Sequence, residues 1–239
     1  MSPPRRAIIA VTSANAPIHG GKDTTGLFIT EALHPFLVLT AAGFEVDLAS
    51  ETGKYTADTN SLDESFLNGE DRKIWEDTNS EFRKKLDNMK PARELVNEDY
   101  GIFYASAGHA SLIDYPKAVS LHEIAAQVWD KGGVVASVCH GPAIFDGLND
   151  LKTGEPLIKG KKITGFTTEG ENMLGVTDEI KAWGQPLVEE LAEKLGASYS
   201  RAPGAWDDYH VVDGRLVTGQ NPASASSTAR AAVEVFEKL

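Results

Sequence analysis

The fold of this chain is set by one stretch of its sequence, Gly132-Gly-Val-Val-Ala-Ser-Val-Cys-His-Gly-Pro-Ala-Ile-Phe-Asp-Gly-Leu148. Residues 134–138 form a short β-branched apolar run behind two glycines, which is typical of a parallel strand buried on both faces. The second half places Pro142 where the first turn of a helix would lie, and apolar residues follow at helical spacing. The pattern therefore predicts a buried strand, a sharp turn and a helix.

Cys139 and His140 lie on the predicted turn. A side chain on such a turn projects into the crevice at the carboxyl end of a sheet, where it meets the positive end of the helix dipole. We therefore expect a readily ionised, nucleophilic thiol. A lone buried cysteine is more often only a small core hydrophobe, but the turn favours the reactive group.

Composition limits the class of protein. The chain has 239 residues, of which 41% are hydrophobic, so it can bury a core, and we expect one α/β domain spanning 1–239. There is no apolar run of membrane-spanning length and no signal-peptide core, so we expect a cytoplasmic protein without membrane partners. The net charge of −12 makes nucleic acid a poor partner.

The sequence offers little to a metal or a nucleotide. Its single cysteine can form neither an internal disulfide nor a thiolate zinc site, and its six histidines show no H-x-x-x-H pairing. No glycine-rich phosphate loop follows the first apolar run. We therefore expect neither a metal nor another cofactor.

Strand and helix patterns alternate along the chain, which predicts a mostly parallel sheet. We expect a helix that Thr24 or Thr25 caps and His34-Pro35 interrupts. The Asp-Gly pair at 213–214 indicates a hairpin. Expected strands lie at 7–11, 44–49, 100–106, 134–138 and 162–166, and other expected helices at 121–129, 186–195 and 223–236.

The segment 52–97 departs from this alternation. It is dense in Asp, Glu, Asn and Lys, with helical patterns at 64–67 and 71–89, and has too few apolar residues for a core of its own. We interpret it as a small helical cap inserted after the second strand. Trp75 and Phe82 would anchor it.

Glu31 lies among apolar residues of the first helix. One interpretation places it on the solvent face of that helix. The other is a buried carboxyl whose pKa is raised by desolvation, so that it stays protonated and donates to a thiolate.

Small residues follow the strand at 100–106. The Gly108 N–H is a candidate oxyanion donor together with the N–H after the nucleophile, and we place Gly141 in the same oxyanion and substrate-binding group. His109 is either a structural loop histidine or a substrate contact.

Glu169 and Glu171 lie in a stretch that we expect to be a loop beyond a short strand. Such carboxylates are usually only solvated. One of them at the carboxyl edge of the sheet is instead a candidate to orient a histidine, as the third member of a nucleophile, base and carboxylate set.

Several motifs together resemble the ThiJ/PfpI superfamily of flavodoxin-like folds, and within it the fungal glyoxalase III branch of heat-shock chaperone-like proteins. The motifs span nearly the whole chain. They are Glu31 before His34-Pro35, Ser50-Glu-Thr-Gly53, Phe66-Leu-Asn-Gly69, Ala107-Gly-His109, Ala136 to Gly147, Gly165-Phe-Thr167 and Thr218 to Ser224.

The resemblance implies a flavodoxin-like three-layer sandwich and a homodimer. It also implies a glutathione-independent glyoxalase, a lyase that converts the 2-oxoaldehyde methylglyoxal to lactate without a cofactor. Carried over, the catalytic triad is Cys139, His140 and Glu171, with Glu31 as the helix glutamate. Glu171 is preferred to Glu169 because it precedes an apolar-Gly segment. Glutaminase activity is disfavoured, since no H-x-E spacing occurs near the C-terminus.

Other functions remain open at this point. In a stress chaperone or redox sensor, the same cysteine would be oxidised and an apolar surface would hold unfolded client proteins. Protein deglycation and peptidase activity also begin with thiolate attack on a carbonyl.

Overall fold

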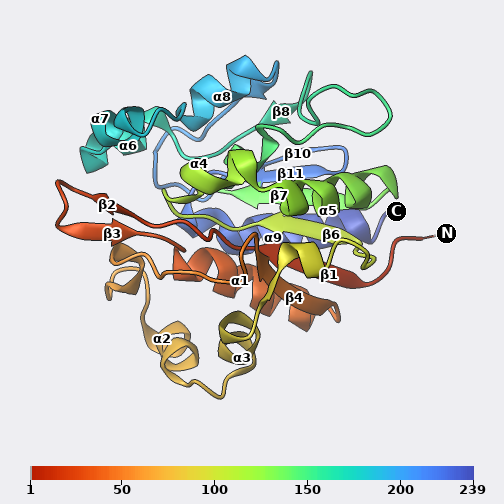
Figure 1. Cartoon of the computed structure of the whole chain (residues 1–239), viewed down its shortest axis with the longest axis horizontal. Coiled ribbons are helices and arrows are strands. Elements are labelled where there is room, and N and C mark those ends of the chain that lie inside the picture. Colours follow the sequence, from red (N-terminus) through yellow and green to blue (C-terminus); the bar gives the residue numbers. More distant parts are fainter. Residues whose placement is uncertain (1) are drawn as a thin grey trace.

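The computed structural model describes residues 2–239, and a sheet of seven strands lies at its centre (Figure 1). Neighbouring strands are parallel except for the hairpin of β10 and β11. In spatial order the strands are β10 His210–Asp213, β11 Leu216–Gly219, β7 Val134–Val138, β6 Ile102–Ala105, β1 Arg6–Ala10, β4 Glu45–Ser50 and β5 Lys90–Pro91.

The strand order fixes where a site can form. The long parallel strands lie side by side in the order β4, β1, β6, β7, β11. Counted along the chain this is the order 2-1-3-4-5, which is the flavodoxin-like order. The order reverses beside β1, so the crevice at the carboxyl ends of β1 and β6 is the expected ligand site. Smaller sheets pair β2 Ala16–Ile18 with β3 Asp23–Thr25 and β8 Lys162–Ile163 with β9 Ser198–Tyr199.

Helices cover both faces of the sheet, which confirms the expected three layers. Helices α1 and α9 pack on one face and α5 on the other (Figure 1). The helices are α1 Ile29–Ala41, α2 Gly69–Glu76, α3 Glu81–Asp87, α4 Ser111–Asp114, α5 Val119–Asp130, α6 Thr168–Leu174, α7 Thr177–Ala182, α8 Val188–Lys194 and α9 Ala225–Phe236.

Alternate residues of the strands enter different cores. Ile8 of β1 packs into the core beneath α5, whereas its neighbours Ala7 and Ile9 pack beneath α1 and α9. All three are fully buried. Strands covered on both faces need apolar residues at every position, which explains why the apolar runs are continuous.

The first helix differs from the prediction in two respects, its N-terminal cap and its course at Pro35. Thr24 and Thr25 belong to β3, and α1 begins at Ile29 without a side-chain cap. The helix also runs through Pro35 unbroken. A proline inside a helix costs about 3 kcal/mol, and we attribute its tolerance to the packing of α1 against α9 and the sheet.

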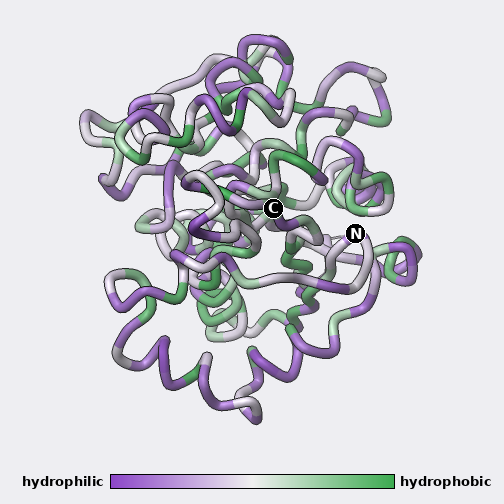
Figure 2. Tube along the Cα trace, turned by 60° about the vertical axis from the view of Figure 1, so that its left-hand side comes forward, coloured by the Kyte–Doolittle hydropathy of each residue, from purple (hydrophilic) through white to green (hydrophobic). Residues whose placement is uncertain are grey.

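The cap segment forms two short helices, α2 and α3, where a single helix at 71–89 was predicted; residues 64–67 form turns. Ser80 divides them because its side chain accepts from the Arg83 N–H and caps α3. Phe82 is buried against Phe36, with ring centroids 5.6 Å apart, while Trp75 is only half-buried. Figure 2 shows this mostly hydrophilic segment at the foot of the molecule.

Two predictions around the central strand were wrong in detail. The turn after β7 leads into a short 3₁₀ helix, η4 (Gly141–Phe145), rather than an α-helix. The predicted loop at 167–172 is mostly helix α6, because Thr167 accepts from the Gly170 N–H and caps it. Glu171 therefore lies in the first turn of a helix.

Candidate active site

Cys139 lies on a strained turn at the carboxyl end of β7. Its φ of 59° is in the left-handed region, which costs a residue with a side chain about 1–3 kcal/mol. Two hydrogen bonds hold the turn: the Cys139 N–H donates to the Gly219 carbonyl at 3.0 Å, and the Phe166 N–H donates to the Cys139 carbonyl at 2.8 Å. The turn thus aims a thiol at the crevice while leaving it almost fully buried.

Cys139, His140 and Glu171 form a continuous hydrogen-bonded chain. The Cys139 Sγ lies 3.2 Å from His140 Nδ1, and His140 Nε2 lies 2.7 Å from Glu171 Oε1. A carboxylate only accepts, so Nε2 carries the proton and Nδ1 is free to accept from the thiol. The histidine is therefore placed as a base for the sulfur and is oriented by the carboxylate.

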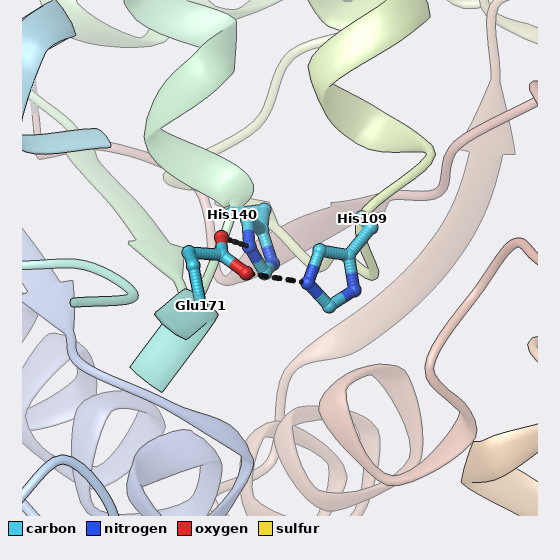
Figure 3. A group of neighbouring side chains, drawn as sticks. All are labelled: His109, His140 and Glu171. Atoms are coloured by element: carbon cyan, nitrogen blue, oxygen red, sulfur yellow. Dashed lines mark hydrogen bonds and ion pairs between the residues drawn. The ribbon is translucent and has the colours of Figure 1, made fainter. Parts of the chain in front are cut away.

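Glu171 also binds a second histidine. His109 Nε2 lies 2.8 Å from Glu171 Oε2, and the rings of His109 and His140 are 4.1 Å apart. Figure 3 shows the two oxygens of this carboxylate reaching one imidazole each. His109 follows β6, whereas His140 follows β7, so neighbouring strand ends deliver both rings to one carboxylate.

Glu31 approaches the thiol from the first turn of α1 and is completely buried, as the second interpretation of this residue requires. The carboxyl interacts with Cys139, but the geometry is short of a formed hydrogen bond. Both of its oxygens lack a partner among the described residues. Desolvation raises the pKa of Glu31 to about 8, so the carboxyl is mostly protonated at neutral pH.

Burial and charge divide the protonation states of the other groups. Burial is the largest single influence on Glu171 and by itself would raise the pKa of this carboxyl. The charges and hydrogen bonds of His109 and His140 together outweigh burial and lower the pKa to about 2. Burial and the charge of His109 lower the pKa of His140, whereas attraction to Glu171 outweighs burial and raises the pKa of His109. These shifts favour a charged His109–Glu171 pair and a neutral His140 in the resting site.

The expectation of a readily ionised thiol does not describe this resting site. Burial and the nearby Glu31 raise the pKa of Cys139 well above its ordinary value. The helix after the turn is too short and of the wrong kind to supply the expected dipole. The resting thiol is therefore protonated at neutral pH, with His140 Nδ1 placed 3.2 Å away to accept its proton.

A cavity of about 130 Å³ opens over the sulfur. Gly108 lines it with a φ of 143°, and a Cβ at this position would lie 2.0 Å from the Gly26 carbonyl oxygen, so only glycine fits. Gly141 does not line the cavity; its close approach is to the Ala105 carbonyl. The lining residues are His19, Phe28, Asp58, Asn60, Phe66, Gly108, His109, Cys139, His140, Phe166, Leu174, Trp206 and Pro222.

His109, His140 and Glu171 also have the ligand types and spacing that a divalent metal could use, since their ligand atoms lie within 4.8 Å of one another. In this structure the Nε2 atoms of His109 and His140 are both hydrogen-bonded to the Glu171 carboxylate.

None of the helices in the described part of the chain is both long and apolar enough to cross a membrane.

The structure also separates the two candidate glutamates. Glu169 points outward and pairs with Arg201 on the surface, whereas Glu171 is 2% exposed. Sequence reasoning missed the aromatic wall of the cavity, formed by Phe28, Phe66, Phe166 and Trp206. Phe66 and Phe166 lie in motifs of the family resemblance, but the four rings come from distant segments and share no periodic pattern, so no local signal marked them as the wall of one cavity.

The fold and the site define an α/β protein with a cysteine, a histidine and a glutamate hydrogen-bonded in series at a strained strand-end turn. The chain belongs to the DJ-1/PfpI family, whose model matches residues 26–235.

Curated relatives match along nearly their whole length. Glyoxalase 3 of Candida albicans is 53% identical over 97% of this chain and 98% of the relative. The glutathione-independent glyoxalase HSP31 of Saccharomyces cerevisiae is 51% identical over 98% of this chain and 99% of the relative. The crystal structure of glyoxalase III from Candida albicans superposes with a TM-score of 0.96 at 52% identity, covering 98% of each chain.

Proposed function

We propose that this chain is a glutathione-independent glyoxalase that converts methylglyoxal to lactate through a hemithioacetal on Cys139, without a cofactor. The observation that carries the proposal is the series from Cys139 through His140 to Glu171 at the base of a cavity, with the neutral Glu31 beside the sulfur. The names of the curated relatives support it.

The first step joins the substrate to the protein. His140 Nδ1 takes the thiol proton, the sulfur adds to the aldehyde carbon, and the aldehyde oxygen takes the proton back from His140. The backbone N–H groups of Gly108 and His140 stabilise the charge that develops on this oxygen. A small substrate suits the cavity above Cys139.

The second step moves hydrogen between the two carbons. His140 removes the proton from the former aldehyde carbon, the electron pair forms a carbon–carbon double bond, and the ketone oxygen takes the proton of Glu31. The enediol then returns a hydroxyl proton to Glu31 and takes the proton of His140 on the second carbon. The product is a lactoyl thioester, and one carbon has been oxidised as the other was reduced.

The last step releases the product. His140 takes a proton from an attacking water, the tetrahedral intermediate expels the Cys139 sulfur, and the sulfur regains its proton. The sum is methylglyoxal plus water giving lactate. No external oxidant, reductant or glutathione enters the balance.

We extend the proposal to the organisation of the protein: one domain over 1–239 with a cap at about 52–97, acting as a cytoplasmic homodimer. The long-range packing that links the sheet to both helical layers supports a single domain.

The test is to incubate the purified protein with methylglyoxal in the absence of glutathione and to assay lactate. We expect turnover, and a loss of about 10³-fold or more in Cys139→Ala, because the nucleophile is gone. Glu169→Gln, which changes an exposed neighbour of the triad, is the matched control and should stay within about twofold. Full activity in Cys139→Ala would remove the mechanism.

A second candidate, holding unfolded client proteins, is favoured by large apolar side chains left exposed beside one cavity, namely Phe66 at 37% and Trp206 at 38%. The same Cys139→Ala variant separates the two functions. Suppression of the aggregation of a heated client does not need the nucleophile. A protein that forms no lactate but suppresses aggregation in both forms is a chaperone.

A further inference from the structure

A second cavity adjoins the one above Cys139. It measures about 470 Å³, against about 130 Å³ for the inner cavity. The two share Phe66, Leu174, Trp206 and Pro222 as lining residues, so these side chains stand at the passage between them. The outer cavity is otherwise lined by Thr30, His34, Ser65 and Ala223.

Two aromatic rings at this passage are held from inside. Phe66 packs edge-on against Phe28, with centroids 5.0 Å apart, and Trp206 packs edge-on against Phe166 at 5.5 Å. Even so, Phe66 is 37% exposed and Trp206 is 38% exposed. Large apolar side chains that are fixed in place and yet exposed beside a reactive group are typical of a ligand pocket.

We propose that the outer cavity is a subsite for an apolar, preferably aromatic, substituent on the ketone carbon of a 2-oxoaldehyde. The inference rests on the proposed function and names the substrate class of the same site. With the aldehyde carbon at Cys139, a substituent larger than methyl extends from the inner cavity past Phe66 and Trp206.

The charges near the outer cavity favour an uncharged substituent. His34 is the single titratable side chain among the lining residues, and its Nε2 is already engaged with Asp71 at 2.7 Å. No lysine or arginine lines either cavity within residues 2–239, so neither cavity offers a permanent positive charge to a phosphate or carboxylate tail.

Alkylation of the single cysteine tests the subsite without requiring turnover. The thiolate of Cys139 displaces bromide from phenacyl bromide or from bromoacetone, forming a carbon–sulfur bond, and mass spectrometry follows both rates. We expect the phenacyl-to-acetonyl rate ratio to exceed that of N-acetylcysteine by about tenfold or more, since one methylene in an apolar pocket is worth about 10–200-fold. A ratio equal to or below that of the free thiol overturns the subsite.

A filling substitution locates the effect. Ala223 is exposed and lines only the outer cavity, so Ala223→Trp should return the rate ratio to that of N-acetylcysteine. A circular dichroism spectrum and an unfolding midpoint like those of the wild type show that this variant is folded. Ala182→Trp, at an exposed position that lines neither cavity, is the matched control and should keep the wild-type ratio. Loss of aryl preference in both variants, or in neither, contradicts the assignment.

The two proposals fail separately. Turnover of methylglyoxal without an aryl preference in alkylation rejects the subsite and leaves the glyoxalase standing. An aryl preference with no lactate from methylglyoxal keeps the subsite and rejects the glyoxalase. Where both hold, the ratio of kcat/KM for phenylglyoxal to kcat/KM for methylglyoxal should fall about tenfold in Ala223→Trp and keep its wild-type value in Ala182→Trp.

Discussion

Two glutamates on opposite sides of Cys139–His140 are both buried, and yet they hold opposite protonation states. Glu31 lies in the first turn of α1 and is 0% exposed, while Glu171 lies in the first turn of α6 and is 2% exposed. The pKa of Glu31 is raised to about 8, whereas that of Glu171 is lowered to about 2.

The difference comes from partners rather than from burial. Glu31 has no hydrogen bond of normal geometry to either oxygen among the described residues, so desolvation decides its pKa. Glu171 receives one N–H from each of two imidazoles, and these interactions outweigh desolvation. One site therefore keeps a carboxylic acid and a carboxylate within reach of the same residues, which acid–base chemistry at neutral pH requires.

The largest effect is expected from neutralising the charged member of this pair. Glu171→Gln keeps the shape but removes the charge that orients His140 and stabilises its protonated form. We expect kcat for lactate formation to fall about 10³- to 10⁴-fold. A fall of less than about tenfold would show that the carboxylate does not act through His140.

Glu31, the uncharged member of the pair, should lower the free energy of unfolding at alkaline pH. The folded pKa of Glu31 lies above the ordinary value of 4.5, so its stabilising contribution is complete below about pH 4.5 and is lost as pH rises to about 8. Glu31→Gln should therefore be more stable than wild type by up to about 4 kcal/mol at pH 8. Urea unfolding at pH 5 and pH 8 measures this, and an equal difference at both pH values contradicts it.

The same substitution should slow catalysis. Glu31→Gln cannot supply a proton to the ketone oxygen, so we expect kcat to fall about 10²-fold while the fold is kept. It should also change how readily peroxide oxidises Cys139, because the carboxyl that interacts with the sulfur is lost. Unchanged kcat would exclude Glu31 as the proton donor.

The smallest effect concerns the second histidine on Glu171. The charge of His109 helps to lower the pKa of His140. His109→Asn removes that charge, and the Glu171 carboxylate then interacts with His140 alone, so the pKa of His140 should rise. The acid limb of the kcat/KM–pH profile should then move to higher pH, because His140 must be neutral to act as a base. His210→Asn, at an exposed position on β10, should not move it.

The sequence predicted those parts of the molecule that depend on local patterns. Val134–Val138 is a strand with the predicted bounds, because a run buried on both faces has an unbroken apolar signature. The hairpin at Asp213-Gly214 and the closing helix follow from turn and amphipathic patterns of the same local kind.

What depends on contacts between distant segments was not predictable in the same way. The state of the Cys139 thiol depends on burial by elements from the whole chain, and a pattern at 139–148 pointed to ready ionisation instead. The bond from His109 to Glu171 joins strand-end and helix residues that are 62 positions apart. The α6 helix was missed because Thr167, its cap, reads equally well as part of a polar loop.

The central claim, that Glu31 is an acid and Glu171 a carboxylate in the same resting site, is open to one direct measurement. Infrared spectra of protein labelled with carbon-13 in its glutamate side chains would show a protonated carboxyl band at pH 7. We predict that this band disappears in Glu31→Gln and persists in Glu171→Gln. Absence of the band in the wild-type protein, or its persistence in Glu31→Gln, would show that Glu31 is not the protonated carboxyl.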